Sequence, residues 1–128
     1  MRNAECGIKI EKSMKENVIK TKSRDFAIRI VKFYQWLKDN KHEYVLSRQI
    51  LRSGTSIGAN ISEGIRGQSK QDFYAKMNIA LKEANETYYW LDLLFATGYV
   101  EEPAYRSLSQ KCEELISILV AITKTQTK

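Results

Sequence analysis

Apolar residues recur along most of the chain at spacings of three and four, which is the period of an amphipathic helix. Short polar stretches divide the pattern into four segments, at about residues 23–40, 43–66, 69–98 and 103–124. Helices joined by short connections favour antiparallel neighbours. The pattern therefore predicts an all-α fold, an antiparallel up-and-down four-helix bundle with a long third helix.

Residues 1–22 differ from the rest because their apolar residues are isolated among Lys, Glu and Asn. We expect an N-terminal arm, mobile or docked on a neighbour, followed by the bundle at residues 23–128. Ser23 is the expected N-cap of the first helix, since a serine side chain accepts hydrogen bonds from the free N–H groups of a first turn. The apolar stripe behind it consists of Phe26, Ile30, Phe33, Tyr34 and Leu37.

The second segment has an unusual middle, because residues 53–60 are rich in Ser, Gly and Thr, which are weak helix formers. Gly54, Gly58 and Ser62 nevertheless lie four residues apart and so share one helical face. Such a row allows another helix to approach closely. We therefore expect a helix rather than a loop, ending with Gly64 or Gly67 in the left-handed conformation.

The third segment has three adjoining apolar rows instead of one stripe, and in two of them the residues are seven apart. A surface this wide suits a helix with partners on two sides, either in the centre of the bundle or at a subunit interface. The fourth segment starts at Pro103, a residue suited to a first helical turn. Its apolar seam consists of Tyr105, Leu108, Cys112, Leu115, Leu119 and Ile122.

Charge is distributed unevenly along the 128 residues, whose net charge is +6. Residues 1–52 hold 13 Lys and Arg against 6 Asp and Glu, whereas residues 53–128 hold 8 against 9. A basic surface favours nucleic acid or anionic lipid, although a merely solvated Lys-rich face has the same composition. The candidate nucleic-acid-binding residues are Arg24, Arg29, Lys32, Lys38, Lys41, Arg48 and Arg52.

The chain contains no recognisable catalytic or metal-binding motif. Its one histidine, His42, falls in a predicted turn, and Cys6 and Cys112 lie at opposite ends. Glu83 and Glu86 share a helical face, but the Glu-x-x-His partners of a di-metal bundle site are missing, so we interpret them as an exposed or interface acidic edge. We expect no enzyme activity, no metal and no cofactor.

Targeting signals are also missing from the sequence. The N-terminus continues into charged residues rather than an apolar run, and no stretch of about 18 uncharged apolar residues could span a membrane. We therefore expect a cytoplasmic protein with no membrane partner.

Residues 49–64 read QILRSGTSIGANISEG. This segment resembles the motif Q-x-x-R-(S/A)-x-x-S-I-x-x-N-I-x-E-G of the 23S rRNA intervening-sequence protein family, and the similarity covers about residues 23–123. The resemblance implies a four-helix bundle that forms a homo-oligomer, typically a homopentamer enclosing a basic barrel. A relative, the accessory protein of diversity-generating retroelements, binds nucleic acid and a reverse transcriptase. RNA or DNA and a protein such as a reverse transcriptase are therefore candidate partners.

The residues of this motif with polar or structural roles are Arg52, Ser53, Ser56, Asn60, Glu63 and Gly64. Polar groups sealed inside a bundle must be hydrogen-bonded or they destabilise it. We interpret them as a structural network that ties the second helix to a neighbouring helix or loop, with a ligand site as the alternative.

Two functional hypotheses follow. The first is a non-enzymatic, oligomeric nucleic-acid-binding or ribonucleoprotein accessory protein that uses the basic residues of the first two helices. The alternative is a structural or protein-interaction module whose basic charge is incidental.

Overall fold

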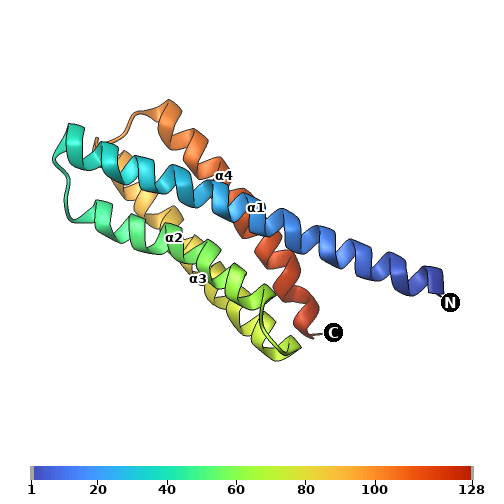
Figure 1. The fold of residues 1–128 in the computed structure, drawn as a ribbon. Coiled ribbons are helices and arrows are strands. Elements are labelled where there is room, and N and C mark those ends of the chain that lie inside the picture. The colour runs from blue at the N-terminus through green and yellow to red at the C-terminus, as the bar shows by residue number, and fades with distance from the viewer. Residues whose placement is uncertain (1, 128) are drawn as a thin grey trace.

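The computed structural model describes the backbone of residues 2–127 and the side chains of Met14 and residues 16–126. Within this range the chain forms four α-helices and no strand, so the all-α prediction is confirmed. In Figure 1 the chain reverses direction at each connection between helices. The elements are α1 (Arg2–Lys41), α2 (Leu46–Ile65), α3 (Lys70–Ala96), α4 (Glu102–Lys124) and a 3₁₀ turn (Thr125–Thr127).

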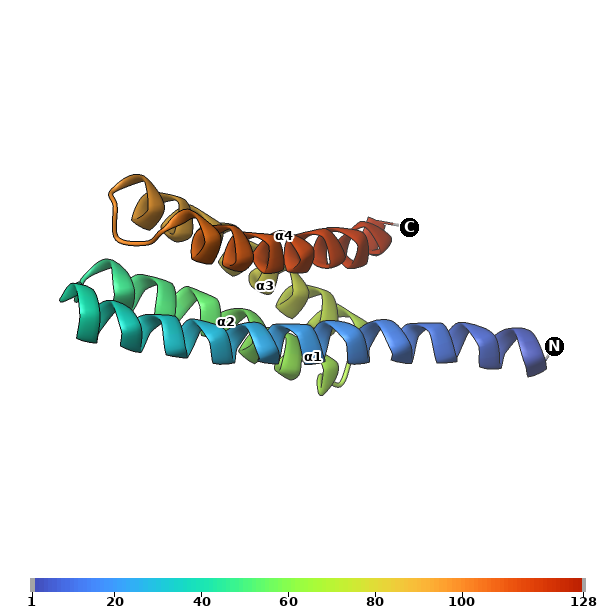
Figure 2. The same ribbon diagram turned by 90° about the horizontal axis from the view of Figure 1, so that it is seen from above.

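Helix α1 begins at Arg2, so the predicted start at Ser23 is wrong. Ser23 lies inside the helix, where its hydroxyl donates to the carbonyl of Lys20 at 3.1 Å, a common bond for a serine within a helix. Ile19 is fully buried and lies seven residues before Phe26, so that the two share one face of α1. With 40 residues, α1 exceeds the 27 of α3, and its N-terminal part projects beyond the other helices (Figure 2).

The turn between α1 and α2 is built around His42 and Glu43. His42 has a φ of 54°, and the N–H of Glu43 donates to the carbonyl of Leu37 at 3.1 Å, the pattern of a Schellman C-cap. The Glu43 carboxylate then accepts from the N–H groups of Leu46 at 3.1 Å and Ser47 at 2.7 Å. One buried acidic side chain therefore closes the first turn of α2.

Helix α2 includes the Gly- and Ser-rich segment, as predicted. A Cβ on Gly54 would lie 2.8 Å from Ile30 of α1, and one on Gly58 would lie 3.4 Å from the Ser23 carbonyl. The glycine row therefore faces α1. The expectation of a left-handed Gly64 or Gly67 is wrong, because Gly98 is the described glycine with a positive φ.

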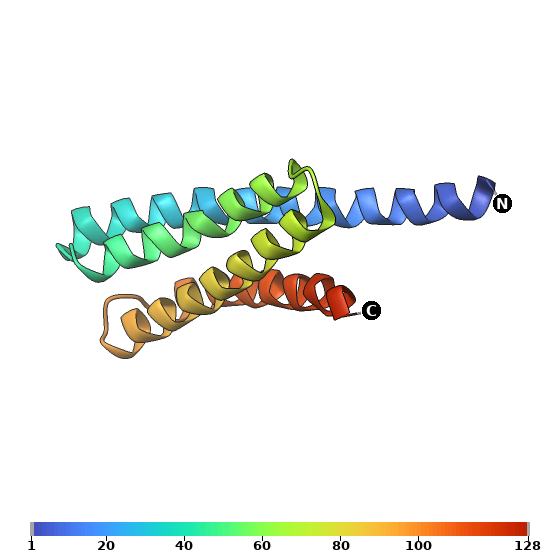
Figure 3. The same cartoon turned by 90° about the horizontal axis from the view of Figure 1, so that it is seen from below.

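Helix α3 runs between α2 and α4 (Figure 3). On the α2 side, Thr87 is bonded to Ser53, and on the α4 side the ring of Phe95 stacks on Tyr105 with centroids 4.3 Å apart. A central position inside this chain's own bundle thus accounts for the width of the apolar surface of α3. None of the helices in the described part of the chain is long and apolar enough to span a membrane.

The core lies between all four helices, but packing is sparse along the seam between α1 and α4. Two polar contacts between described side chains cross that seam. The Arg29 guanidinium donates to the Ser107 hydroxyl at 2.9 Å, and Lys22 pairs with Glu114. Hollows remain on either side of Arg29, so this seam is looser than those that join α1 to α2, α2 to α3 and α3 to α4.

Candidate functional site

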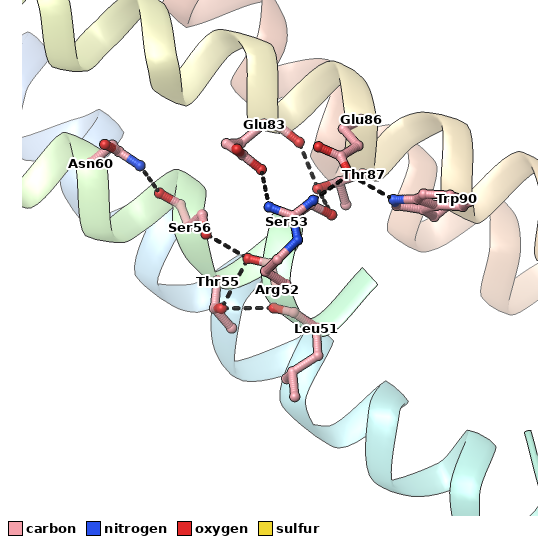
Figure 4. Close-up of polar contacts among 10 residues, drawn as sticks. All are labelled: Leu51, Arg52, Ser53, Thr55, Ser56, Asn60, Glu83, Glu86, Thr87 and Trp90. Atoms are coloured by element: carbon pink, nitrogen blue, oxygen red, sulfur yellow. Dashed lines mark hydrogen bonds and ion pairs between the residues drawn. The ribbon is translucent and has the colours of Figure 1, made fainter. Parts of the chain in front are cut away.

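An ion-pair network joins α2 to α3 on the surface of the bundle (Figure 4). The Arg52 guanidinium donates to Glu83 at 3.3 Å and also to Glu86. The indole N–H of Trp90 donates to the same carboxylate of Glu86 at 3.2 Å. Glu83 and Glu86, the acidic pair on α3, therefore lie at the contact between α2 and α3, where both pair with Arg52.

This network changes the protonation equilibrium of Glu86. The hydrogen bond from Arg52 holds the pKa of the Glu86 carboxyl below its ordinary value of 4.5; partial burial opposes the shift and the Trp90 bond supports it. The same contact raises the pKa of Arg52. Because the folded-state pKa of Glu86 is depressed, its stabilisation is present above pH 4.5 and is lost as pH falls through the folded-state pKa.

Replacing Arg52 with glutamine tests this linkage. We expect a loss of about 0.5–1 kcal/mol in the free energy of unfolding at pH 7, since the side chain of Arg52 is half exposed and water screens the pair. The difference from wild type should be smaller at an acidic pH below the folded-state pKa of Glu86, where that carboxyl group is protonated. Urea unfolding at the two pH values measures both.

Arg106→Gln is the matched control, because Arg106 makes one exposed pair with Glu102 four residues earlier on α4. Its cost should stay below about 0.5 kcal/mol. An Arg52→Gln deficit that is equally large at both pH values would contradict the electrostatic account.

The other polar residues of the 49–64 motif divide into two groups. Ser53 is fully buried and is bonded to Thr87 at 2.8 Å, while Glu63 pairs with Lys76 at 2.8 Å. The Ser56 hydroxyl instead donates to the carbonyl of Arg52 at 2.6 Å, and the Asn60 amide to that of Ser56 at 2.8 Å (Figure 4). These last bonds stay within α2.

The motif thus connects α2 to α3 at three polar positions and at Gly64, where an added Cβ would lie 3.0 Å from Lys76. Ser56 and Asn60 do not reach a neighbour, because short polar side chains in a helix readily bond to the carbonyl one turn earlier. Arg52 and Glu63 are exposed rather than sealed in the bundle.

The seven candidate nucleic-acid-binding residues differ in their surroundings. Arg29, Lys32 and Lys41 line a hollow of about 480 Å³ between α1 and the start of α4. Arg24, Lys38 and Arg48 lie outside that lining, and Arg52 belongs to the network with α3. Apart from Arg52, none of the seven forms an ion pair with a described side chain.

Cys112 is buried, and its thiol donates to the carbonyl of Ala84 at 3.3 Å. Burial raises the pKa of this thiol to about 12. Low thiolate content and lack of access make such a cysteine inert, in line with its expected role as a small core residue. The side chain of Cys6 lies outside the described residues.

In a Cys6→Ser variant, we expect Cys112 to resist an aromatic disulfide reagent at pH 8 for as long as the protein stays folded. Labelling should follow unfolding, so its rate should rise with urea in parallel with the loss of helical circular dichroism. Complete labelling within the mixing time in native buffer would show that the thiol is exposed.

The described side chains include no group of three or more His, Cys, Asp or Glu residues placed to hold a metal ion.

The carboxylate cap at Glu43 was missed in the sequence, because an acidic residue at the start of an expected helix is common and its burial depends on how the helices pack. The signal available was its position just before an apolar helical run.

The fold and the contacts between α2 and α3 define an all-α, four-helix protein. The chain belongs to the 23S rRNA-intervening sequence protein family, whose model matches residues 15–121. It is 53% identical to a crystal structure of a protein of unknown function from the S23 ribosomal protein family of Bacteroides thetaiotaomicron. The TM-score is 0.84, and the match covers 86% of this chain and 98% of that one. No curated protein is similar to this chain in sequence.

Proposed function

We propose that this protein is a non-enzymatic, oligomeric nucleic-acid-binding or ribonucleoprotein accessory protein, and that the antiparallel helix bundle is one protomer of the oligomer. The observation that carries the proposal is the basic surface of α1 and α2. Six of its seven basic residues have no acidic partner among the described side chains. Unpaired cations can release counterions from phosphates on binding.

Salt dependence tests the proposal. Binding of RNA or DNA to the full-length protein should weaken steeply with salt, with log K falling linearly against log salt concentration. Each basic residue that contacts a phosphate and is neutralised should reduce the slope by about one. Lys32→Gln and Arg48→Gln are suitable changes, and Lys70→Gln on α3 is the matched control, because Lys70 is exposed and lies outside the basic surface. Absence of salt-dependent binding to any nucleic acid would refute the proposal.

Exposed apolar side chains on α1 support self-association. Met14, Val18, Ile28 and Val31 are between 38% and 60% exposed on this one helix. Large apolar residues gathered on a free helix face are common at protein interfaces. A homo-oligomer, with five copies as the expected number from the family resemblance, would bury them.

Light scattering measures the assembly directly. We expect a mass that is a multiple of the 14.8 kDa protomer, and a shift toward the protomer mass in an Ile28→Glu variant, because an unpaired charge is costly to bury in an interface. Gln110→Glu is the control, since Gln110 is an exposed polar residue of α4 and lies away from the apolar face of α1. A wild-type mass of one protomer would rule the oligomer out.

The alternative is a structural or protein-interaction module, favoured by the same exposed apolar residues of α1. A protein such as a reverse transcriptase would then be the main ligand. Reversing the charge of Arg24, Lys38 and Arg48 separates the two functions. It should abolish nucleic-acid binding in the first case and leave capture of the protein partner unchanged in the second.

A further inference from the structure

The hollow between α1 and α4 has a buried apolar floor. Phe33, Val100 and Leu108 line it and are 4–8% exposed. Its volume of about 480 Å³ lies within the usual range of ligand pockets, roughly 300–1,000 Å³. α1 and α4 run beside each other here (Figure 2), and the bond from Arg29 to Ser107 marks one end. The hollow therefore lies between α1 and the start of α4.

An aromatic ring stands at the wall of this hollow. Trp36 is 39% exposed, and its ring stacks on the buried Phe33 with centroids 6.2 Å apart and planes within 12°. The ammonium group of Lys41 lies 5.7 Å from the Trp36 ring centroid. Lys41 has a long flexible side chain, so its ammonium group can move aside for a second flat ring that stacks on Trp36, and stacking of this kind is tolerant of base identity.

Basic side chains line the α1 side of the same hollow. Arg29, Lys32 and Lys41 belong to its lining, and Glu101 is the acidic residue opposite them. Lys32 and Lys41 are exposed, whereas Arg29 is half-buried and held by Ser107. The three positive charges thus lie beside an apolar, aromatic recess, an arrangement that complements a ligand with an anionic backbone and flat apolar rings.

We propose that the hollow between α1 and α4 binds single-stranded nucleic acid, with an unpaired base against Trp36 and the adjoining phosphates at Lys32 and Lys41. The proposal rests on the nucleic-acid-binding function above and assigns a place to it. Bases in a duplex are already stacked and paired, so a recessed ring reaches them poorly, whereas the bases of a single strand can be splayed out.

Tryptophan fluorescence is the experiment of choice, because the chain has two tryptophans, Trp36 and Trp90. A full-length Trp90→Phe protein reports on Trp36 alone. It is titrated with a thymidine oligonucleotide of about twelve nucleotides, with an RNA oligonucleotide of the same length, with a hairpin duplex and with free UMP. We expect quenching by both single strands at concentrations about tenfold or more below those at which the duplex or UMP acts.

Binding is then compared between variants by anisotropy of the labelled oligonucleotide. Trp36→Ala should weaken binding about tenfold or more, since one stacked base is lost. Tyr89→Ala is the matched control, because Tyr89 is 57% exposed on α3, outside the hollow. Glu101→Gln should tighten binding about twofold or more, because it removes the negative charge that faces the phosphates.

A second variant fills the hollow with a large side chain, so that the test does not depend on whether Trp36→Ala folds correctly. Ala104 is exposed and lines the hollow, and Ala121 is exposed on α4 outside it. Ala104→Trp should weaken binding about tenfold, whereas Ala121→Trp should leave it unchanged. Both substitutions lie at exposed positions, and circular dichroism checks that the helices are intact.

The outcomes distinguish a wrong assignment of the hollow from a wrong proposed function. If the basic-surface variants weaken binding while Trp36→Ala and Ala104→Trp match their controls, the assignment of the hollow is wrong and the proposed function stands. Equal affinity for duplex, or quenching by UMP as strong as by the strands, also overturns the assignment, in the second case in favour of a nucleotide pocket. A wild-type protein that binds no nucleic acid at low salt overturns both.

Discussion

Replacing Glu43 with alanine is expected to lower the free energy of unfolding by about 2 kcal/mol, because it removes the cap of α2. Glu43 is 8% exposed, and its carboxylate accepts hydrogen bonds from the N–H groups of Leu46 and Ser47. Ser47 is fully buried, so water cannot replace the lost acceptor. The melting temperature should fall by about 6–10 °C at fixed protein concentration.

Glu43→Gln is the matched control for this prediction. The glutamine side chain keeps an oxygen that accepts the same bonds but loses the negative charge at the helix N-terminus, which is worth about 0.3–1 kcal/mol. Urea unfolding should therefore rank the stabilities as wild type, then Glu43→Gln, then Glu43→Ala. Equal stability of the alanine and glutamine variants would show that the hydrogen bonds contribute nothing.

Replacing Gly54 with alanine is the second large change, with an expected net loss of about 1–2 kcal/mol. The new Cβ would lie 2.8 and 2.9 Å from the two γ-carbons of Ile30. Ile30 is fully buried and β-branched, so its side chain cannot turn away without strain. The overpacking cost, about 1–3 kcal/mol, exceeds the gain of about 1 kcal/mol from replacing glycine in a helix.

Gly58→Ala is the matched control, one turn further along the same face of α2. Its Cβ would lie 3.4 Å from the carbonyl of Ser23, an ordinary contact. The helix-propensity gain should then dominate and stabilise the protein by up to about 1 kcal/mol. Thermal unfolding of the two variants should therefore shift in opposite directions. A stabilised Gly54→Ala protein would show that α1 and α2 are further apart than the structure places them.

Where glycine is required thus depends on which atoms face it rather than on the motif that contains it. Gly54 and Gly58 are indistinguishable in the sequence, since both belong to one row at a spacing of four. Only the packing of α1 against α2 separates a position that excludes a methyl group from one that accepts it.

The sequence by itself determined the helical class and most of the core. The period of apolar residues is a property of the local chain, and it placed α2, α3 and α4 within a few residues of their observed bounds. The motif at residues 49–64 is also a local feature, since all its residues lie in one continuous segment, and it was therefore enough to indicate the family. The cysteine in the fourth apolar seam was also correctly placed, since Cys112 is fully buried there.

The tertiary structure decided what depends on contacts between distant segments. Ile19 is an isolated apolar residue in the sequence, and its complete burial, which extends the packed part of α1 before Ser23, depends on its neighbours in space. Arg52 has the same chemistry as the other six candidate basic residues, yet among these seven it is the one that pairs with Glu83 and Glu86 of α3. Arg29, Lys32 and Lys41 gather at one hollow because α4 passes beside α1. The burial and the partners of a side chain are set by the helix opposite it, and the pattern along a single helix does not contain that information.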